Sequence, residues 1–203
     1  MSLENNLVDL GLPSGTLWAK CNVGAFTPAD SGLFFQWGDI IGHTNDWNYV
    51  NQTCPFNNGS SGWDGTYWNK VKTVISVNNQ IIERFDVATI KYGSGWRTPT
   101  NTQYLELLNT SNCTRSLGTQ TDSTGNTVSG LVLTSVRNGN SIFFPYSGYY
   151  NGTTLNNKGT LSKFWTSTED NKVHSFYIFY ANNATIVNND SHEGLTIRPV
   201  YNP

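Results

Sequence analysis

Charged side chains are scarce in this 203-residue sequence. Asp, Glu, Lys and Arg make up 13% of it, about half of their usual share in globular proteins. Twelve basic and 14 acidic side chains leave a net charge of -2 without a basic cluster, which argues against a nucleic-acid partner. Asn, Thr, Ser and Gly take the place of the missing charges, and an aromatic content of 13% argues against disorder.

Long apolar runs are also missing. No stretch of about 18 apolar residues occurs, so we expect no membrane-spanning helix. The segment from Met1 to Leu10 has no basic start followed by an apolar stretch, so we expect no signal peptide in this chain. The length suits one substantial hydrophobic core, and we expect residues 1–203 to form one domain.

Cysteine is rare and scattered, at Cys21, Cys54 and Cys113. These residues form no Cys-x-x-Cys pair, and three cysteines allow at most one disulfide within the chain. Side-chain packing must therefore supply the stability, and the redox compartment is left open.

Side chains that could carry catalysis are dispersed. His43, His174 and His192 show neither His-x-His nor His-x-x-x-His spacing. The sequence has no Gly-x-Ser-x-Gly nucleophile elbow and no Asp-x-Asn-x-Asp-Gly cation loop. We therefore expect no catalytic metal, no cofactor, no covalent nucleophile and no enzymatic activity. A pair of carboxylates that meets only in space, as in glycosidases, is left open.

Short apolar runs separated by turns rich in Gly and Asn predict a strand-rich chain. Residues 42–80 are mostly Asn, Gly, Thr and aromatics, and we interpret them as a loop-rich insertion. The expected strands are Leu7–Leu10, Thr16–Ala19, Leu33–Trp37, Val71–Val77, Gly130–Val136, Ser141–Tyr146, Lys163–Thr168, Val173–Tyr180, Ala184–Val187 and Leu195–Val200.

Two helices are expected between the early and the late strands. The first, Asp86–Tyr92, begins with an acidic residue suited to a helix N-terminus and stops at a glycine. The second, Thr100–Asn109, begins with a Thr-x-x-Gln capping box, and its apolar residues at i, i+3 and i+4 form one stripe that includes Leu107 and Leu108. Strands, central helices and further strands predict an α+β fold.

A series of short motifs runs in order from about residue 7 to residue 200. They are Val8–Ala19, Cys21–Ala25, Phe35–Gly38, Asp86–Thr89, Gly95–Thr100, Asn140–Pro145, Gly148–Gly152, Phe164–Thr168 and Gly194–Val200. Together they resemble the Fibrobacter succinogenes major paralogous domain, a family abundant in gut Bacteroidetes. Arg97–Thr100, ahead of an amphipathic helix, also resembles the Arg-Leu-Pro-Thr segment of formylglycine-generating and sulfatase-modifying proteins.

These resemblances imply a C-type-lectin-like domain, the fold also found in variable receptor-binding proteins of phages and bacteria. Such a domain has paired terminal strands, twisted antiparallel sheets, two central helices and long loops that form a ligand face. The fold alone does not assign an activity. No cysteine follows Cys113, which removes the oxidase chemistry of formylglycine-generating enzymes, and the Glu-Pro-Asn and Trp-Asn-Asp sequences of calcium-dependent lectins are missing.

The tryptophans fall into two groups. Trp18, Trp37, Trp96 and Trp165 lie inside the shared motifs, and we expect them in the core. Trp47, Trp63 and Trp68 lie in the insertion beside Tyr49 and Tyr67, among amide and hydroxyl side chains. Aromatic rings beside such groups suit a sugar-binding or protein-binding surface. The alternative is that these rings pin the insertion onto the domain.

Two late polar segments, residues 149–158 and 181–192, are further candidates for the ligand face. The alternative for both is an ordinary hairpin turn, because Asn and Gly tolerate positive φ. We expect the strands after residue 140 to form one sheet with these loops on one side, close to the insertion. The candidate ligand-binding residues are Trp63, Tyr67, Trp68, Tyr150, Asn151, Asn188, Asn189, Asp190 and His192.

The sequence thus predicts a non-enzymatic, adhesin-like or lectin-like recognition module for a glycan or a surface protein. We expect it outside the cell, on the cell surface or in the secreted repertoire of a gut Bacteroidetes species, without membrane insertion. An alternative is a receptor-binding or fibre protein exposed on the virion of a phage that infects such cells. A third is an assembly domain that contacts sister subunits, and a homo-oligomer is compatible with all three.

Overall fold

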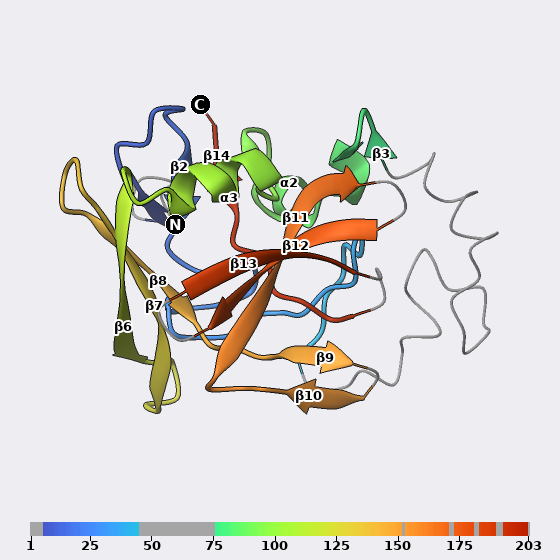
Figure 1. Cartoon of the computed structure of the whole chain (residues 1–203). Helices are drawn as coiled ribbons and strands as arrows, with labels where there is room; N and C mark the ends of the chain where they lie inside the picture. Colours follow the sequence, from blue (N-terminus) through green and yellow to red (C-terminus); the bar gives the residue numbers. More distant parts are fainter. Residues whose placement is uncertain are drawn as a thin grey trace.

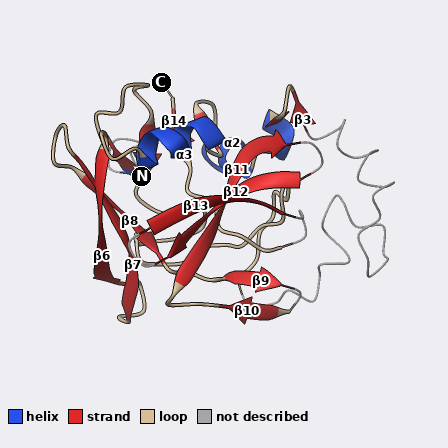
Figure 2. Cartoon of the chain, viewed as in Figure 1, coloured by secondary structure: helices blue, strands red, loops and turns tan. Residues whose placement is uncertain are grey.

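The computed structural model describes residues 6–44, 76–151, 153–170, 173–180, 183–189 and 193–202 (Figure 1). This part of the chain is mostly β, with several antiparallel sheets and two short helices, and so has an α+β fold (Figure 2). Residues 45–75, which make up most of the expected insertion, lie outside the described residues. Neither helix in the described part is long and apolar enough to cross a membrane.

The two ends of the chain meet in one sheet. β1 (Leu7–Val8), β2 (Leu17–Ala19), β14 (Val200–Tyr201) and β5 (Trp96–Arg97) lie in the order β1-β2-β14-β5. Trp18 lies opposite Val8 on one side and Val200 on the other. The expected pairing of an early strand with the last strand is therefore confirmed, but the last strand is Val200–Tyr201, and the rest of the predicted strand Leu195–Val200 forms only isolated bridges at Leu195 and Thr196. Figure 1 shows both termini on the same side of the molecule.

Both predicted helices are present. α2 (Val87–Tyr92) begins after Asp86, whose side chain accepts a hydrogen bond from Ala88 N, and ends at Gly93, which adopts a φ of 92°. A 3-10 turn, η2 (Glu83–Phe85), precedes it. α3 (Asn101–Leu108) has the predicted capping box, and it buries Tyr104, Leu107 and Leu108. Local capping and apolar spacing were therefore sufficient to locate these helices.

A long hairpin forms most of a second sheet. β6 (Cys113–Thr121) pairs with β7 (Thr127–Ser135), and β7 pairs with β8 (Ser141–Pro145). Leu131, Leu133, Ile142 and Phe144 of this sheet are buried in the core. The sequence did not predict β6, because most of its side chains are polar and exposed.

The remaining strands divide between two further sheets. The five-stranded sheet has the order β13 (Asn183–Asn189), β12 (Val173–Tyr180), β11 (Leu161–Asp170), β4 (Gln80–Ile81) and β3 (Ser76–Val77). β9 (Tyr149–Asn151) and β10 (Thr154–Asn156) form a separate hairpin. The expectation of one sheet after residue 140 was therefore wrong, since the strands from β8 to β14 belong to four different sheets.

The core contains two large clusters of buried side chains and a small one. One large cluster surrounds Trp18, Tyr104 and Phe144, the other surrounds Trp37 and Trp165, and the small one consists of Phe34 and Tyr150. The predicted burial of the four motif tryptophans is confirmed, because their exposed fractions are 5% or less. Leu33–Trp37 does not form the expected strand. Its residues pair one at a time, Phe34 with His43 and Phe35 with Leu195, so the ladder is not continuous.

Arg198 is fully buried and joins the end of the chain to its beginning. Its Nε donates to Asn22 Oδ1 at 2.8 Å, and its Nη1 donates to the carbonyl oxygens of Lys20 at 2.7 Å and Ala19 at 3.3 Å. The guanidinium carbon lies 4.7 Å from the centroid of the Phe144 ring. Burial lowers the pKa of Arg198 to about 10, so the side chain is a buried cation at neutral pH.

Candidate functional site at the loop face

Several loops lie on one side of the molecule, on the right of Figure 1. We call this region the loop face. It comprises the β9–β10 hairpin, residues 168–170 and 188–189 of the sheet, Gly194, and the described ends of the insertion at residues 42–44 and 76–80. Asn189 lies opposite His174, and His174 lies opposite Glu169, so the ends of β11 and β13 are neighbours of the start of β12.

The first late loop predicted from the sequence pairs with the chain just after the second one. Tyr150 N donates to Gly194 O, and Gly194 N donates to Tyr150 O, each at 2.9 Å. The β9–β10 hairpin therefore lies against the chain that directly follows residue 192. A sequence pattern could not show this pairing, because the two residues are 44 positions apart and Gly194 belongs to no regular strand.

Tyr150 lies inside the fold and supports the loop face. Its side chain is 5% exposed, and its ring packs edge-on against Phe34 with 5.0 Å between centroids. The hydroxyl donates to Thr44 O at 3.3 Å, and burial raises the pKa of the phenol. Tyr150 thus attaches the hairpin to Thr44, near the start of the insertion, and its ring is not presented to a ligand.

The other predicted contacts are distributed as follows. Asn151, at the end of β9, is exposed. Asn188 and Asn189 end β13, where the structure describes their backbones but not their side chains. The candidates that lie outside the described residues are Trp63, Tyr67, Trp68, Asp190 and His192.

A buried ion pair lies beneath the hairpin. Lys163 Nζ and Glu193 Oε2 are 2.5 Å apart, and both side chains are less than 10% exposed. Lys163 Nζ also lies 3.5 Å from the centroid of the Tyr149 ring, a cation–π contact. The pair therefore fixes residue 193 to β11 and β9. The sequence does not indicate this ion pair, because a lysine and a glutamate 30 positions apart carry no pairing signal.

The insertion is anchored where it leaves the described fold. Asp39 is buried, and its carboxylate accepts hydrogen bonds from Ile41 N at 2.9 Å and Gly42 N at 3.3 Å. Gly42 adopts a φ of 73° against the Phe35 ring, and a Cβ at this position would overlap that ring. Burial raises the pKa of Asp39, while these N–H donors oppose the shift.

The far end of the insertion is anchored in the same way. Ser76 Oγ donates to the buried carboxylate of Glu169, and Glu169 N donates to Asn79 O at 2.9 Å. Asn78 and Asn79 form the turn between β3 and β4 with φ values of 52° and 59°, as a two-residue hairpin of this handedness requires. The insertion therefore begins and ends at the loop face.

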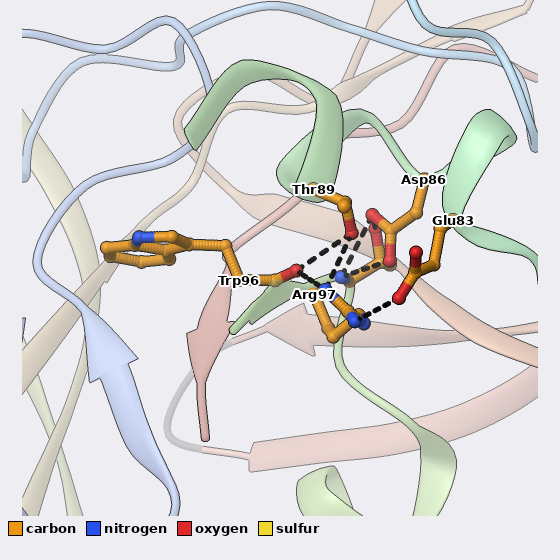
Figure 3. A network of polar contacts seen from close by, with 6 residues as sticks. Glu83, Asp86, Thr89, Trp96 and Arg97 are labelled. Atoms are coloured by element: carbon orange, nitrogen blue, oxygen red, sulfur yellow. Dashed lines mark hydrogen bonds and ion pairs between the residues drawn. The ribbon is translucent and has the colours of Figure 1, made fainter. Parts of the chain in front are cut away.

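A second polar network joins η2, α2 and β5 (Figure 3). Arg97 Nη2 contacts Glu83 Oε1 at 2.5 Å, and Nη1 donates to Thr89 Oγ1 at 3.0 Å. The buried Asp86 carboxylate accepts from Ala88 N, Thr98 N and Thr98 Oγ1 at 2.8–3.1 Å. Burial raises the pKa of Asp86 in spite of these donors. These side chains bond to one another and to the backbone of the fold, so the network holds η2 and α2 against β5.

Among the described residues, no three His, Cys, Asp or Glu side chains lie close enough to hold one metal ion.

Comparison with known families gives one match. Residues 133–200 match a family described as a domain of unknown function (DUF8237). The match covers about a third of the chain and includes the β9–β10 hairpin, the Lys163–Glu193 pair and Arg198. Searches of curated proteins and of solved structures found no match.

Proposed function

We propose that the chain is a non-enzymatic recognition module that binds a glycan or a protein through the loop face. The observation that carries this proposal is the convergence of loops on a rigid frame. The β9–β10 hairpin, Gly194 and both described ends of the insertion are fixed to buried residues by hydrogen bonds. Loops positioned by a rigid scaffold are the usual place for binding residues.

The arrangement also supports a finer proposal, that the fold is C-type-lectin-like. The features in favour are the pairing of β2 with β14, the two helices, and the Arg97–Thr100 segment that leads directly into α3. Loops gathered at one end of a twisted sheet are the ligand-binding region that such a fold implies.

The chemistry around the face favours a neutral ligand. Lys163 and Glu193 neutralise each other inside the fold, and the exposed Asn151 offers an amide. Amides supply directional hydrogen bonds, and aromatic rings pack against the C–H faces of sugars or against apolar side chains. Trp63, Tyr67 and Trp68 are our candidates for those rings.

Two settings are compatible with this function. One is the cell-surface or secreted repertoire of a gut Bacteroidetes species, and the alternative is a receptor-binding or fibre protein of a phage that infects such cells. The same face would serve in both. Neighbouring genes for capsid and tail proteins would favour the phage, whereas neighbouring genes for surface export would favour the cell.

A glycan array and a pull-down from gut bacterial surface material, both with the intact chain, test the function. We expect Trp68→Ala to weaken binding by about 2 kcal/mol and Asn151→Ala by less, since central aromatics contribute most to recognition surfaces. Gln120→Ala, an exposed amide on β6, is the matched control and should bind normally. Unchanged affinity in both face variants, with folding intact, would contradict the proposed site.

A further inference from the structure

β6 is an outer strand with a long unpaired edge. It is the terminal strand of the β6-β7-β8 sheet, and its nine residues pair with β7 without a register shift, from Cys113 opposite Ser135 to Thr121 opposite Thr127. The other edge of β6 has no strand beside it among the described residues.

The hydrogen bonds at the two ends of the hairpin show which backbone groups face outward. Asp122 N donates to Asn126 O, and Val136 N donates to Asn112 O, each at 2.9 Å. Even-numbered positions of β6 are therefore bonded to β7. Because bonding alternates along an antiparallel strand, Arg115, Leu117, Thr119 and Thr121 direct their N–H and C=O groups to the open edge. No described residue bonds to these groups.

The edge also lacks the features that usually protect edge strands from pairing. Protected edges carry bulges, prolines or several charges. β6 has no bulge and no proline, and its one charged residue, Arg115, turns inward to Asn183 Oδ1 and Leu108 O. Leu117, at the midpoint of the strand, is 62% exposed. A long, unbulged and nearly uncharged edge with an exposed leucine is suited to accept another strand.

A groove runs beside this edge. It has a volume of about 550 Å³ and lies between the β6–β7 hairpin and the turn at Gly159 and Thr160. Leu117, Thr119 and Ser129 line it together with the buried Tyr146. Further along β7, the same face of the sheet covers the core. At the groove this face is open, so side chains from an added strand would lie next to the groove.

We propose that this edge pairs with the β6 strand of a second copy of the chain. An antiparallel pairing with its two-fold axis at Leu117 matches all nine residues of both strands. Arg115 then lies opposite Thr119 of the second copy, and the two Leu117 side chains meet on the groove side. The outward-facing pairs, which are Leu117 with Leu117 and Arg115 with Thr119 on either side of it, exchange two hydrogen bonds each.

Charge favours a second copy over a charged partner. The single charge on each strand faces a neutral threonine in this register, so no like charges meet across the pair. The dimer is independent of the proposed ligand and would carry two loop faces in one particle. Such a particle would bind a multivalent surface more tightly than one copy does.

Sedimentation of the intact chain over a range of concentrations tests the pairing. We expect a monomer–dimer equilibrium, and we expect Thr119→Pro to raise the dimer dissociation constant at least about tenfold. Proline removes an outward N–H and leaves the bonds to β7 in place. Gln120→Ala, on the same strand, is the matched control and should dimerise normally. Circular dichroism verifies that both variants fold.

Cysteine cross-linking tests the register. Cα atoms of a hydrogen-bonded antiparallel pair are about 5.5 Å apart, within disulfide range, so Leu117→Cys should form a covalent dimer on oxidation. Gln120→Cys should not, because its two copies would lie about 20 Å apart along the strands. Oxidation of the native chain is the background control, because it measures any cross-links formed by Cys21, Cys54 and Cys113. A monomer at all concentrations, a dimer unaffected by Thr119→Pro, or equal cross-linking of both cysteine variants would overturn the proposal.

Discussion

Arg198 shows how much one buried side chain can connect. It bonds to Asn22 and to the carbonyl oxygens of Ala19 and Lys20, which belong to the opposite end of the chain. Replacement by an apolar side chain would keep the volume but leave these three acceptors, two of them buried and the Lys20 carbonyl partly buried, without their donor. The energetic consequence is therefore set by the acceptors and not by the lost charge alone.

We expect Arg198→Met to lower the free energy of unfolding by about 3 kcal/mol, because each unsatisfied buried acceptor costs roughly 1–3 kcal/mol. Arg198→Lys should lose less, since an ammonium group can still donate to one or two of the acceptors. Urea unfolding followed by fluorescence of the buried tryptophans measures both. Equal stability of the methionine variant and the native chain would show that water replaces the guanidinium without cost.

The buried Asp86 should make stability depend on pH. Burial raises its pKa above the unfolded value of about 3.9, so the folded chain holds this proton more tightly. The favourable contribution of the group is present below that unfolded pKa and is lost as the pH rises through the higher folded pKa. The stability of the native chain relative to Asp86→Asn should therefore fall as the pH rises above about 4.

Denaturant titrations at a series of pH values measure this difference, and Asp122 supplies a control of opposite sign. Hydrogen bonds from Thr124 and Asn126 lower the pKa of Asp122. The contribution of Asp122 is therefore present above its unfolded pKa and lost as the pH falls through the lower folded value. Parallel pH curves for the native chain and Asp86→Asn would contradict the role of Asp86.

Among the elements, the helices were the most predictable. The start of α3 is encoded by two residues three positions apart, Thr100 and Gln103, whose side chains satisfy each other's backbone N–H groups. Such a signal is local and needs no knowledge of the fold. β12 was equally clear, because Val173–Tyr180 is a compact apolar run, and the structure gives the strand the predicted bounds.

The elements that escaped prediction depend on distant partners. β6 is polar and becomes a strand because β7 pairs with it along its full length. At the loop face, Asn151 was predicted, but the supporting ion pair of Lys163 with Glu193 and the backbone pairing of Tyr150 with Gly194 were not. Each joins residues that only the folded chain brings together, so no pattern in the sequence could indicate them.

The capping box of α3 can be tested directly. Thr100→Ala removes the hydroxyl that accepts from Gln103 N at 3.2 Å, and we expect a loss of about 1 kcal/mol. Thr100→Ser keeps the hydroxyl and should stay within a few tenths of a kcal/mol of the native chain. Thermal and urea unfolding give both values. A loss in the serine variant as large as in the alanine variant would assign the effect to the methyl group and not to the cap.

The whole molecule carries little charge, and this should show in its binding. With a net charge of -2 and an internal ion pair beneath the loop face, few charges are free to act on a ligand at a distance. We expect the affinity for a neutral ligand to change by less than about threefold between roughly 0.05 and 0.5 M NaCl. Isothermal titration at several salt concentrations measures it, and a steep decline would reveal a charged ligand.

The arrangement of the terminal strands has a mechanical consequence. β1 and β14 are both antiparallel to β2, so they run in the same direction on its two sides. Tension applied to the two ends would pull β1 and β14 in opposite directions along the strand axis. Their hydrogen bonds lie across that axis, so they would be sheared together instead of being unzipped one by one. Arg198 braces the same junction, and a tethered copy should bear load at its ends while its loops stay in place.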